Sequence, residues 1–205
     1  MRNVFIFHGT GGYPKENWFP WLKSELERLG CKVHIPQFPT PDNQTTETWF
    51  DVLDEYRKFL NEETILIGHS LGGAFLLRFL EESTSFVPLT CEELNEPSGT
   101  TDVKKTKIAA AFIIAAPVGV TRTMFWDGDK PFISHLFNWD AIKANCRHFC
   151  VFHSDDDPYV PLENGRDCAK QLEVDLNFIP NAGHFNAESG YSEFAELLEE
   201  VQKIL

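Results

Sequence analysis

The chain has 205 residues, of which 42% are hydrophobic, and 31 Asp and Glu residues outnumber 18 Lys and Arg residues. This length predicts a single domain spanning 1–205 with one substantial core. The formal charge of -13 disfavours binding to nucleic acid or to an anionic membrane, so neither is expected as a partner. No apolar run reaches transmembrane length, and a strand follows Met1 with no room for a secretory signal. We therefore expect a cytoplasmic protein.

The cysteines indicate neither a metal site nor a disulfide framework. Their number is odd and no C-x-x-C pair occurs, so free thiols in a reducing compartment are the simplest interpretation. No cofactor and no metal are expected. The cysteines are Cys31, Cys91, Cys146, Cys150 and Cys168.

Segments typical of strands and helices alternate along the chain. In order, we expect a strand at 4–8, a helix from Asn17 as N-cap to about Leu29 with Gly30 as its stop, a strand at 32–36, a helix at 45–60, a short apolar strand from about 63, a helix over 74–80, strands at 108–115 and 148–153, a helix at 162–172, a strand at 174–179 and a helix at 189–205. This alternation predicts an α/β fold, with a parallel sheet, right-handed crossovers and helices on both faces.

Two segments interrupt the alternation. The polar segment 83–107 is expected to be an inserted surface loop. Segment 117–138 instead carries aromatic residues among turn residues. It is interpreted as a possible small cap over the site, although aromatic residues packed simply as core explain it nearly as well.

The third strand leads into the most informative motif of the chain. It ends in Gly68-His69-Ser70-Leu71-Gly72, a G-x-S-x-G sequence that passes directly into a helix. A sharp strand-to-helix turn of this kind lifts a serine hydroxyl above the edge of a sheet. Glycines two residues on either side avoid collisions with the neighbouring backbone. In this context Ser70 is predicted to be a nucleophile.

A serine nucleophile needs a base, and the base needs an acid to orient it. Three carboxylates at 155–157 follow the fifth predicted strand, and they cannot all reach one imidazole. Asp157 is favoured because Pro158-Tyr159-Val160 follows it, as in the D-x-x-V-P turn of many hydrolases, and Asp156 is the alternative. His184 lies among small residues after the sixth strand, where the base is required.

The negative oxygen of a tetrahedral intermediate needs backbone N–H donors. Leu71, next to the nucleophile at a helix N-terminus, is predicted to supply one of them. Thr10, in the glycine-rich loop 8–12, is predicted to supply the other. That loop lacks the Lys-Ser/Thr ending and the G-x-G-x-x-G spacing of phosphate-binding loops, so nucleotide binding is not expected.

Together these residues resemble the α/β-hydrolase superfamily, and more narrowly the small serine hydrolases grouped with retinoblastoma-binding protein 9 and the bacterial YdeN proteins. The resemblance covers nearly the whole chain. It implies a reduced α/β-hydrolase fold with a doubly wound, mostly parallel six-stranded sheet in the order 2-1-3-4-5-6, and a Ser70, Asp157, His184 triad. The motifs that carry it are the opening strand and glycine loop, the W-x-x-W-x-K stretch at 18–23, and the segments 68–70, 139–146, 156–158 and 183–185.

The leading functional hypothesis is a serine hydrolase that cleaves small ester or amide substrates through an acyl-enzyme, with carboxylesterase or peptidase-like activity. The alternative is a non-catalytic, protein-binding member of the same fold. A different reaction on the same triad, such as that of a lyase or a perhydrolase, is also open because fold and triad do not fix the chemistry.

Overall fold

A computed structural model of the chain describes residues 1–82 and 107–205. Its centre is a six-stranded sheet in the order β2-β1-β3-β4-β5-β6, in which all neighbouring strands run parallel. The predicted strand order and the α/β class are therefore confirmed. The strands are β1 (Asn3–Phe7), β2 (Lys32–His34), β3 (Ile65–His69), β4 (Ile108–Ile114), β5 (Cys146–His153) and β6 (Leu176–Phe178).

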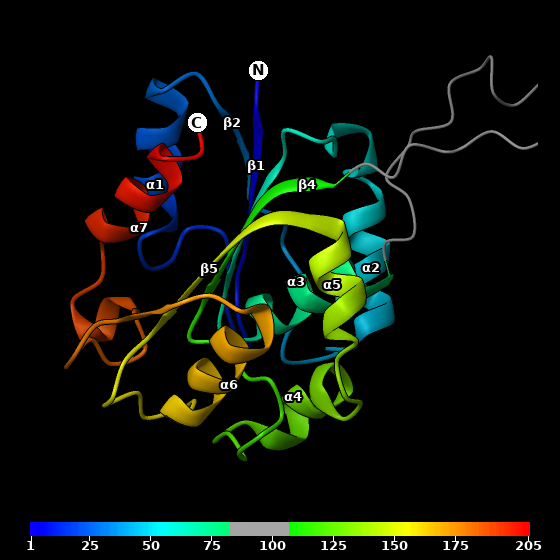
Figure 1. The fold of residues 1–205 in the computed structure, drawn as a ribbon, viewed down its shortest axis with the longest axis vertical. Coiled ribbons are helices and arrows are strands. Elements are labelled where there is room, and N and C mark those ends of the chain that lie inside the picture. Colours follow the sequence, from blue (N-terminus) through cyan, green and yellow to red (C-terminus); the bar gives the residue numbers. More distant parts are fainter. Residues whose placement is uncertain (83–106) are drawn as a thin grey trace, which may run out of the picture.

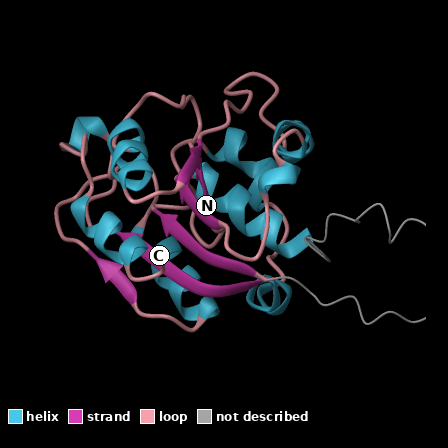
Figure 2. Ribbon diagram, turned by 90° about the horizontal axis from the view of Figure 1, so that it is seen from above, coloured by secondary structure: helices cyan, strands magenta, loops and turns pink. Residues whose placement is uncertain are grey.

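Helices cover both faces of the twisted sheet (Figures 1 and 2). One face carries α1 (Phe19–Arg28) and α7 (Ala195–Gln202). The other carries α2 (Thr46–Asp54), α3 (Leu71–Glu82), α5 (Trp139–Asn145) and α6 (Leu162–Leu172), and α4 (Trp126–Ile133) lies at the end of the sheet where the strands finish. Helices thus cover an apolar layer on each face of the sheet.

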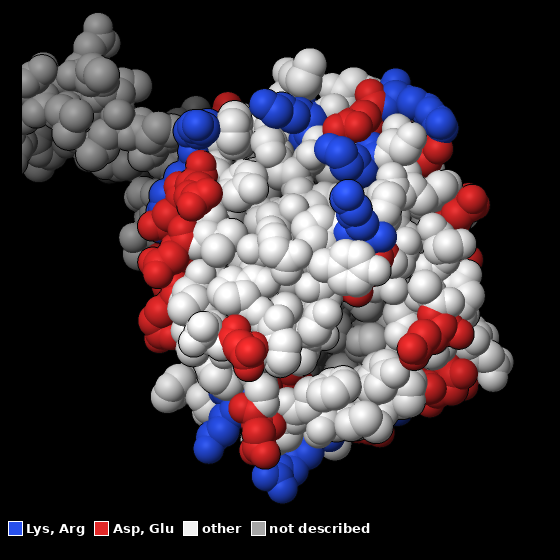
Figure 3. Space-filling model, turned by 180° about the vertical axis from the view of Figure 1, so that it is seen from behind, with Lys and Arg blue, Asp and Glu red and all other residues white. Residues whose placement is uncertain are grey.

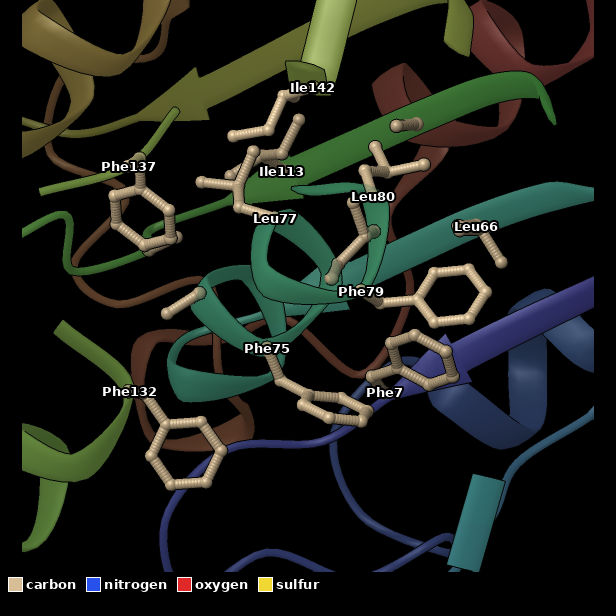
Figure 4. Close-up of a cluster of buried hydrophobic side chains, with 14 of the residues drawn as sticks. Phe7, Leu66, Phe75, Leu77, Phe79, Leu80, Ile113, Phe132, Phe137 and Ile142 are labelled. Carbon is tan, nitrogen blue, oxygen red and sulfur yellow. The ribbon is translucent and has the colours of Figure 1, made fainter. Parts of the chain in front are cut away.

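Strand residues alternate between the two apolar layers. In β3, Ile65 and Ile67 belong to the layer under α1 and α7, whereas Leu66 belongs to the layer under α3. Successive side chains of a strand point to opposite faces, so a strand buried on both sides needs an unbroken apolar run. Helix α3 lies within the apolar layer that contains Leu66, and its Phe75 lies beside Phe7 of β1 (Figure 4).

The segment 117–138 contains α4, and the buried cation of Arg78 on α3 ties this segment to α3. Arg78 Nε donates to the carbonyl oxygen of Phe132 at 2.7 Å, and the Arg78 guanidinium also donates to the carbonyl oxygen of His135. Its carbon Cζ lies 3.8 Å from the centre of the Phe137 ring. Arg78 also forms an ion pair with Glu81 at 2.5 Å. Because Lys and Arg are rarely buried without partners, this ion pair and the carbonyl contacts together explain how Arg78 is tolerated, and the carbonyl contacts hold α4 close to α3.

The start of the first helix differs from the prediction. α1 begins at Phe19, its N-cap is Trp18, and no side chain caps it. Asn17 instead has φ 50, a left-handed conformation that asparagine adopts more readily than most residues. Its Oδ1 accepts the N–H of Ala187 at 2.9 Å, so Asn17 links two distant loops. Gly30, with φ 85, follows the helix as expected.

Two other predicted helices are shorter than expected. The helix predicted over 45–60 is α2, capped by Thr45, followed by a separate 3₁₀ turn at Arg57–Phe59. The helix predicted over 189–205 is α7 alone. A 3₁₀ turn at Ala187–Ser189 precedes it and ends at Gly190 with φ 90, a conformation that cannot continue a helix.

The predicted insertion at 83–107 lies outside the described residues except for Lys107. In the part of the chain that is described, no helix is both long and apolar enough to cross a membrane. Viewed from behind, Asp and Glu side chains gather along one edge of the surface (Figure 3).

Candidate active site

Ser70 occupies the turn between β3 and α3. Its backbone has φ 55, in the left-handed region that is strained for residues other than glycine. The Ser70 N–H still continues the sheet by donating to the carbonyl oxygen of Ile114 at 2.8 Å, and the Ser70 carbonyl accepts the N–H of Gly73 at 2.9 Å. The strained residue is therefore held by a strand on one side and a helix on the other.

The glycines of the turn are required by close backbone contacts. A Cβ atom added to Gly68 would lie 2.6 Å from the carbonyl oxygen of Gly72, and one added to Gly72 would lie 2.2 Å from the carbonyl oxygen of Phe7. Gly9 is equally tight, because a Cβ there would lie 2.7 Å from the Cβ of Ser70. These contacts seat the glycine loop directly against the serine.

We expect Gly72→Ala to destabilise the fold by about 3 kcal/mol or more, since the new methyl group meets rigid backbone atoms on β1. Gly30→Ala is the matched control. A Cβ at Gly30 meets nothing within 4 Å, so only the strain of φ 85 remains, at about 1 kcal/mol. Urea unfolding at equal m-value measures both changes. Equal unfolding midpoints for the two variants would show that the close contact at Gly72 does not add to the loss of stability.

His184 and Asp157 form a buried pair. His184 Nδ1 donates to Asp157 Oδ2 at 2.7 Å, and the two side chains are 7% and 0% exposed. The other carboxylate oxygen, Oδ1, accepts the N–H groups of Tyr159 at 2.9 Å and of Val160 at 3.0 Å. Because a carboxylate only accepts, the proton of a neutral His184 lies on Nδ1. The lone pair of Nε2 is therefore available to accept a proton.

The other two carboxylates of the cluster bind the backbone of the histidine loop. Asp156 Oδ1 accepts the N–H of Gly183 at 2.7 Å and the hydroxyl of Ser154 at 2.7 Å. Asp155 Oδ1 accepts the N–H of Asn181 at 2.9 Å. The structure thus directs each of the three adjacent aspartates to a different partner, and of these three only Asp157 contacts the imidazole of His184.

Two buried aromatic side chains hold the same loop from the other side. The Nε2 of His69 donates to the carbonyl oxygen of His184 at 2.7 Å, and the Nε1 of Trp18 donates to the carbonyl oxygen of Phe185 at 3.0 Å. Burial lowers the pKa of His69 to about 3, so His69 remains a neutral donor at physiological pH. The sequence did not show that His69 and Trp18 donate these hydrogen bonds. In the sequence, His69 is only a neighbour of the serine and Trp18 is only part of an aromatic motif.

The two predicted oxyanion donors have unused N–H groups. Thr10 lines the cavity that contains Ser70, and Leu71 is the first residue of α3. Among the described residues, no hydrogen bond uses the backbone N–H of Thr10 or of Leu71. Two free donors therefore lie near the serine, one in the glycine loop and one at the first residue of α3.

Ser70 and His184 line one cavity of about 240 Å³. No hydrogen bond joins Ser70 Oγ to His184 within the described chain, and such contacts are commonly long before substrate binds. The remaining lining residues are Gly9, Thr10, Glu16, Asn17, His69, Phe125, Tyr159, Asn186 and Glu188. Sequence reasoning missed Glu16, Asn17, Asn186 and Glu188 as lining residues, because they belong to none of its catalytic motifs.

The cavity carries negative charge at its rim. Glu16 and Glu188 line it, and neither Lys nor Arg does. Burial raises the pKa of Glu16, and Glu188 Oε2 accepts the hydroxyl of Tyr159 at 3.2 Å. Among the described residues, no group of three or more His, Cys, Asp or Glu side chains is placed to hold a metal ion.

The sheet order, the strained serine between a strand and a helix, and the histidine-bearing loop beyond β6 define an α/β hydrolase. A family model described as serine hydrolase matches residues 4–90 and 98–203. The chain belongs to this serine hydrolase family, as the motifs predicted.

Relatives extend over nearly the whole chain. YdeN of Bacillus subtilis (strain 168) is 29% identical over 191 residues, which cover 93% of this chain and 90% of YdeN. The serine hydrolase RBBP9 of Rattus norvegicus is 24% identical and covers 97% of this chain and 91% of its own length. The crystal structure of the B. subtilis ydeN product superposes with a TM-score of 0.83 at 25% identity, covering 100% of this chain and 98% of that one.

The fold alone is shared more widely. Est1E of Butyrivibrio proteoclasticus, solved with ferulic acid bound, matches with a TM-score of 0.62 at 15% identity, covering 98% of this chain and 90% of that chain. The core architecture therefore tolerates extensive sequence change.

Proposed function

We propose that this serine hydrolase cleaves small ester or amide substrates through an acyl-enzyme on Ser70, with His184 as general base and acid and Asp157 as its orienting group. The observation that carries this proposal is the buried pair between His184 Nδ1 and Asp157 Oδ2 at 2.7 Å. It leaves His184 Nε2 free in the cavity that also contains Ser70.

In the acylation step, Ser70 Oγ attacks the carbonyl carbon of the substrate and its proton passes to His184 Nε2. The tetrahedral oxyanion accepts hydrogen bonds from the Thr10 and Leu71 N–H groups. The intermediate then collapses, and the leaving alcohol or amine takes the proton from His184. Water repeats the sequence on the acyl-enzyme, which releases the acid and restores Ser70.

The lining of the cavity supports a substrate with an apolar group. The cavity of about 240 Å³ shares Thr10 and Phe125 with a neighbouring cavity of about 510 Å³, so its volume alone sets no upper limit on substrate length. Phe125 and Tyr159 supply aromatic surface, which suits a short apolar acyl or leaving group.

Covalent labelling tests this proposal against the alternative of a non-catalytic binding protein. A fluorophosphonate probe is expected to modify the peptide that contains Ser70 in the folded protein, and not in heat-unfolded protein or in Ser70→Ala. Absence of an adduct from the folded protein would favour a binding role. A panel of nitrophenyl esters of increasing acyl length, run beside aminoacyl amides, then separates esterase from amidase activity.

A further inference from the structure

Asp129 is a buried carboxylate that no step of the proposed reaction uses. It lies on α4 and is 4% exposed. Within the described residues it pairs with no Lys or Arg side chain, and burial raises its pKa. Burying an acid without a neighbouring cation costs free energy. The groups that hydrogen-bond to Asp129 therefore indicate which segments it holds in place.

Its partners are two threonine hydroxyls from different segments. Thr123 Oγ1 donates to Asp129 Oδ2 at 2.6 Å, which fixes the carboxylate relative to the segment before α4. Thr10 Oγ1 donates to the other oxygen, Oδ1, at 3.2 Å. Thr10 is 119 positions away in sequence and supplies one of the two N–H groups proposed for the oxyanion.

A second chain of hydrogen bonds joins the same loop to the same helix. The N–H of Gly11 donates to Thr40 Oγ1 at 2.6 Å, and that hydroxyl donates to Gln44 Oε1 at 2.5 Å. Gln44 Nε2 then donates to the carbonyl oxygen of Gly128 at 2.8 Å. Gln44 is 7% exposed, whereas the bond from Gly11 to Thr40 at the other end of this connection is exposed to solvent. Two neighbouring residues of the glycine loop are thus each tied to neighbouring residues of α4.

We propose that Asp129 is a positioning residue that orients the Thr10 N–H toward the oxyanion, and that α4 is thereby part of the catalytic apparatus. This inference rests on the proposed function. An oxyanion donor acts only when it lies about 2.7–3.1 Å from the developing charge. Of residues 9–12, only Thr10 carries a side chain. The bond from the Thr10 side chain to a rigid, buried acceptor supplies this constraint.

Substitutions at Thr10 and Asp129 test the proposal with 4-nitrophenyl acetate as substrate. Thr10→Val keeps the backbone N–H and the branched shape but removes the hydroxyl. It is expected to lower kcat by about 10- to 100-fold with KM within about twofold, a smaller loss than the 10²–10³ that follows removal of a donor outright. Thr10→Ser, which keeps the hydroxyl, is expected to restore kcat to within about threefold of the original.

Asp129→Asn is expected to give a loss of similar size. The two hydroxyls bond to different carboxylate oxygens, and the amide replaces one of these acceptors by an NH2 donor. If Asp129 acts through Thr10, the two losses do not multiply. The double variant Thr10→Val/Asp129→Asn is then expected to have a kcat within about threefold of that of the slower single variant. Asp140→Asn, the same chemical change on a side chain that is 97% exposed, is the matched control and is expected to leave kcat unchanged. Multiplicative losses in the double variant would overturn the proposal.

Hydrogen exchange of the peptide covering residues 9–12 gives a readout that does not depend on turnover. Exchange is expected to be faster in Thr10→Val and Asp129→Asn than in the original chain. Unchanged exchange together with unchanged kcat overturns the positioning role. A wild-type protein that hydrolyses no ester and takes up no fluorophosphonate instead contradicts the proposed function, while altered exchange would still show that Asp129 holds the loop.

Discussion

Replacing Ser70 with alanine is expected to lower kcat for an activated ester by roughly 10⁴-fold or more, because the variant has no oxygen to form the acyl-enzyme. Residual hydrolysis then comes only from substrate binding and the oxyanion donors. Progress curves with 4-nitrophenyl acetate, at enzyme concentrations high enough to follow the slow variant, measure the ratio. A variant that kept more than about a hundredth of the original rate would remove Ser70 from the nucleophile role.

The fold of this variant is expected to remain intact. Ser70 Oγ makes no hydrogen bond within the described residues, and alanine has to adopt the same φ of 55 that serine already tolerates. The free energy of unfolding should therefore change by about 1 kcal/mol or less. Ser192→Ala, on an exposed residue remote from the cavity lining, is the matched control and should alter neither rate nor stability.

The sequence was sufficient for the elements whose signals are local. The apolar runs of β3 and β4 predicted strands, and the alternation of strands and helices predicted a parallel sheet. The helix over 162–172 was predicted with the bounds that α6 has. α4 was not predicted as a helix because it contains Gly128 and Pro131, which both weaken helices. Its tertiary contacts outweigh this poor propensity, among them the bond from Arg78 to the Phe132 carbonyl.

The predicted site residues had local motifs, whereas the residues that hold them in place had none. Ser70, the cluster 155–157 and His184 each follow a strand at the expected point in the chain. By contrast, the bonds from His69 and Trp18 to the carbonyls of 184–185 depend on how distant loops pack. So does the bond from Thr10 to Asp129 across 119 positions. A sequence pattern specifies which residue types approach one another, but it does not show which polar atoms pair.

The assignment of the three aspartates gives the second large effect. Asp157→Asn is expected to lower kcat by about 10⁴-fold, because an amide nitrogen facing His184 Nδ1 favours the tautomer whose Nε2 carries a proton and cannot act as a base. Asp156 was the alternative acid from sequence. Its Oδ1 instead accepts from Gly183 and Ser154, and an asparagine oxygen can still accept both bonds.

Asp156→Asn should therefore keep kcat within about tenfold of the original and act mainly by lowering stability. Steady-state kinetics of both variants, with thermal unfolding to confirm that each is folded, measures the contrast. A loss in Asp156→Asn as large as that in Asp157→Asn would mean that the rigidity of the histidine loop limits the rate, rather than the orientation of its imidazole. If instead Asp156→Asn alone were inactive, the orienting group would be Asp156, in contradiction to the 2.7 Å contact between His184 and Asp157.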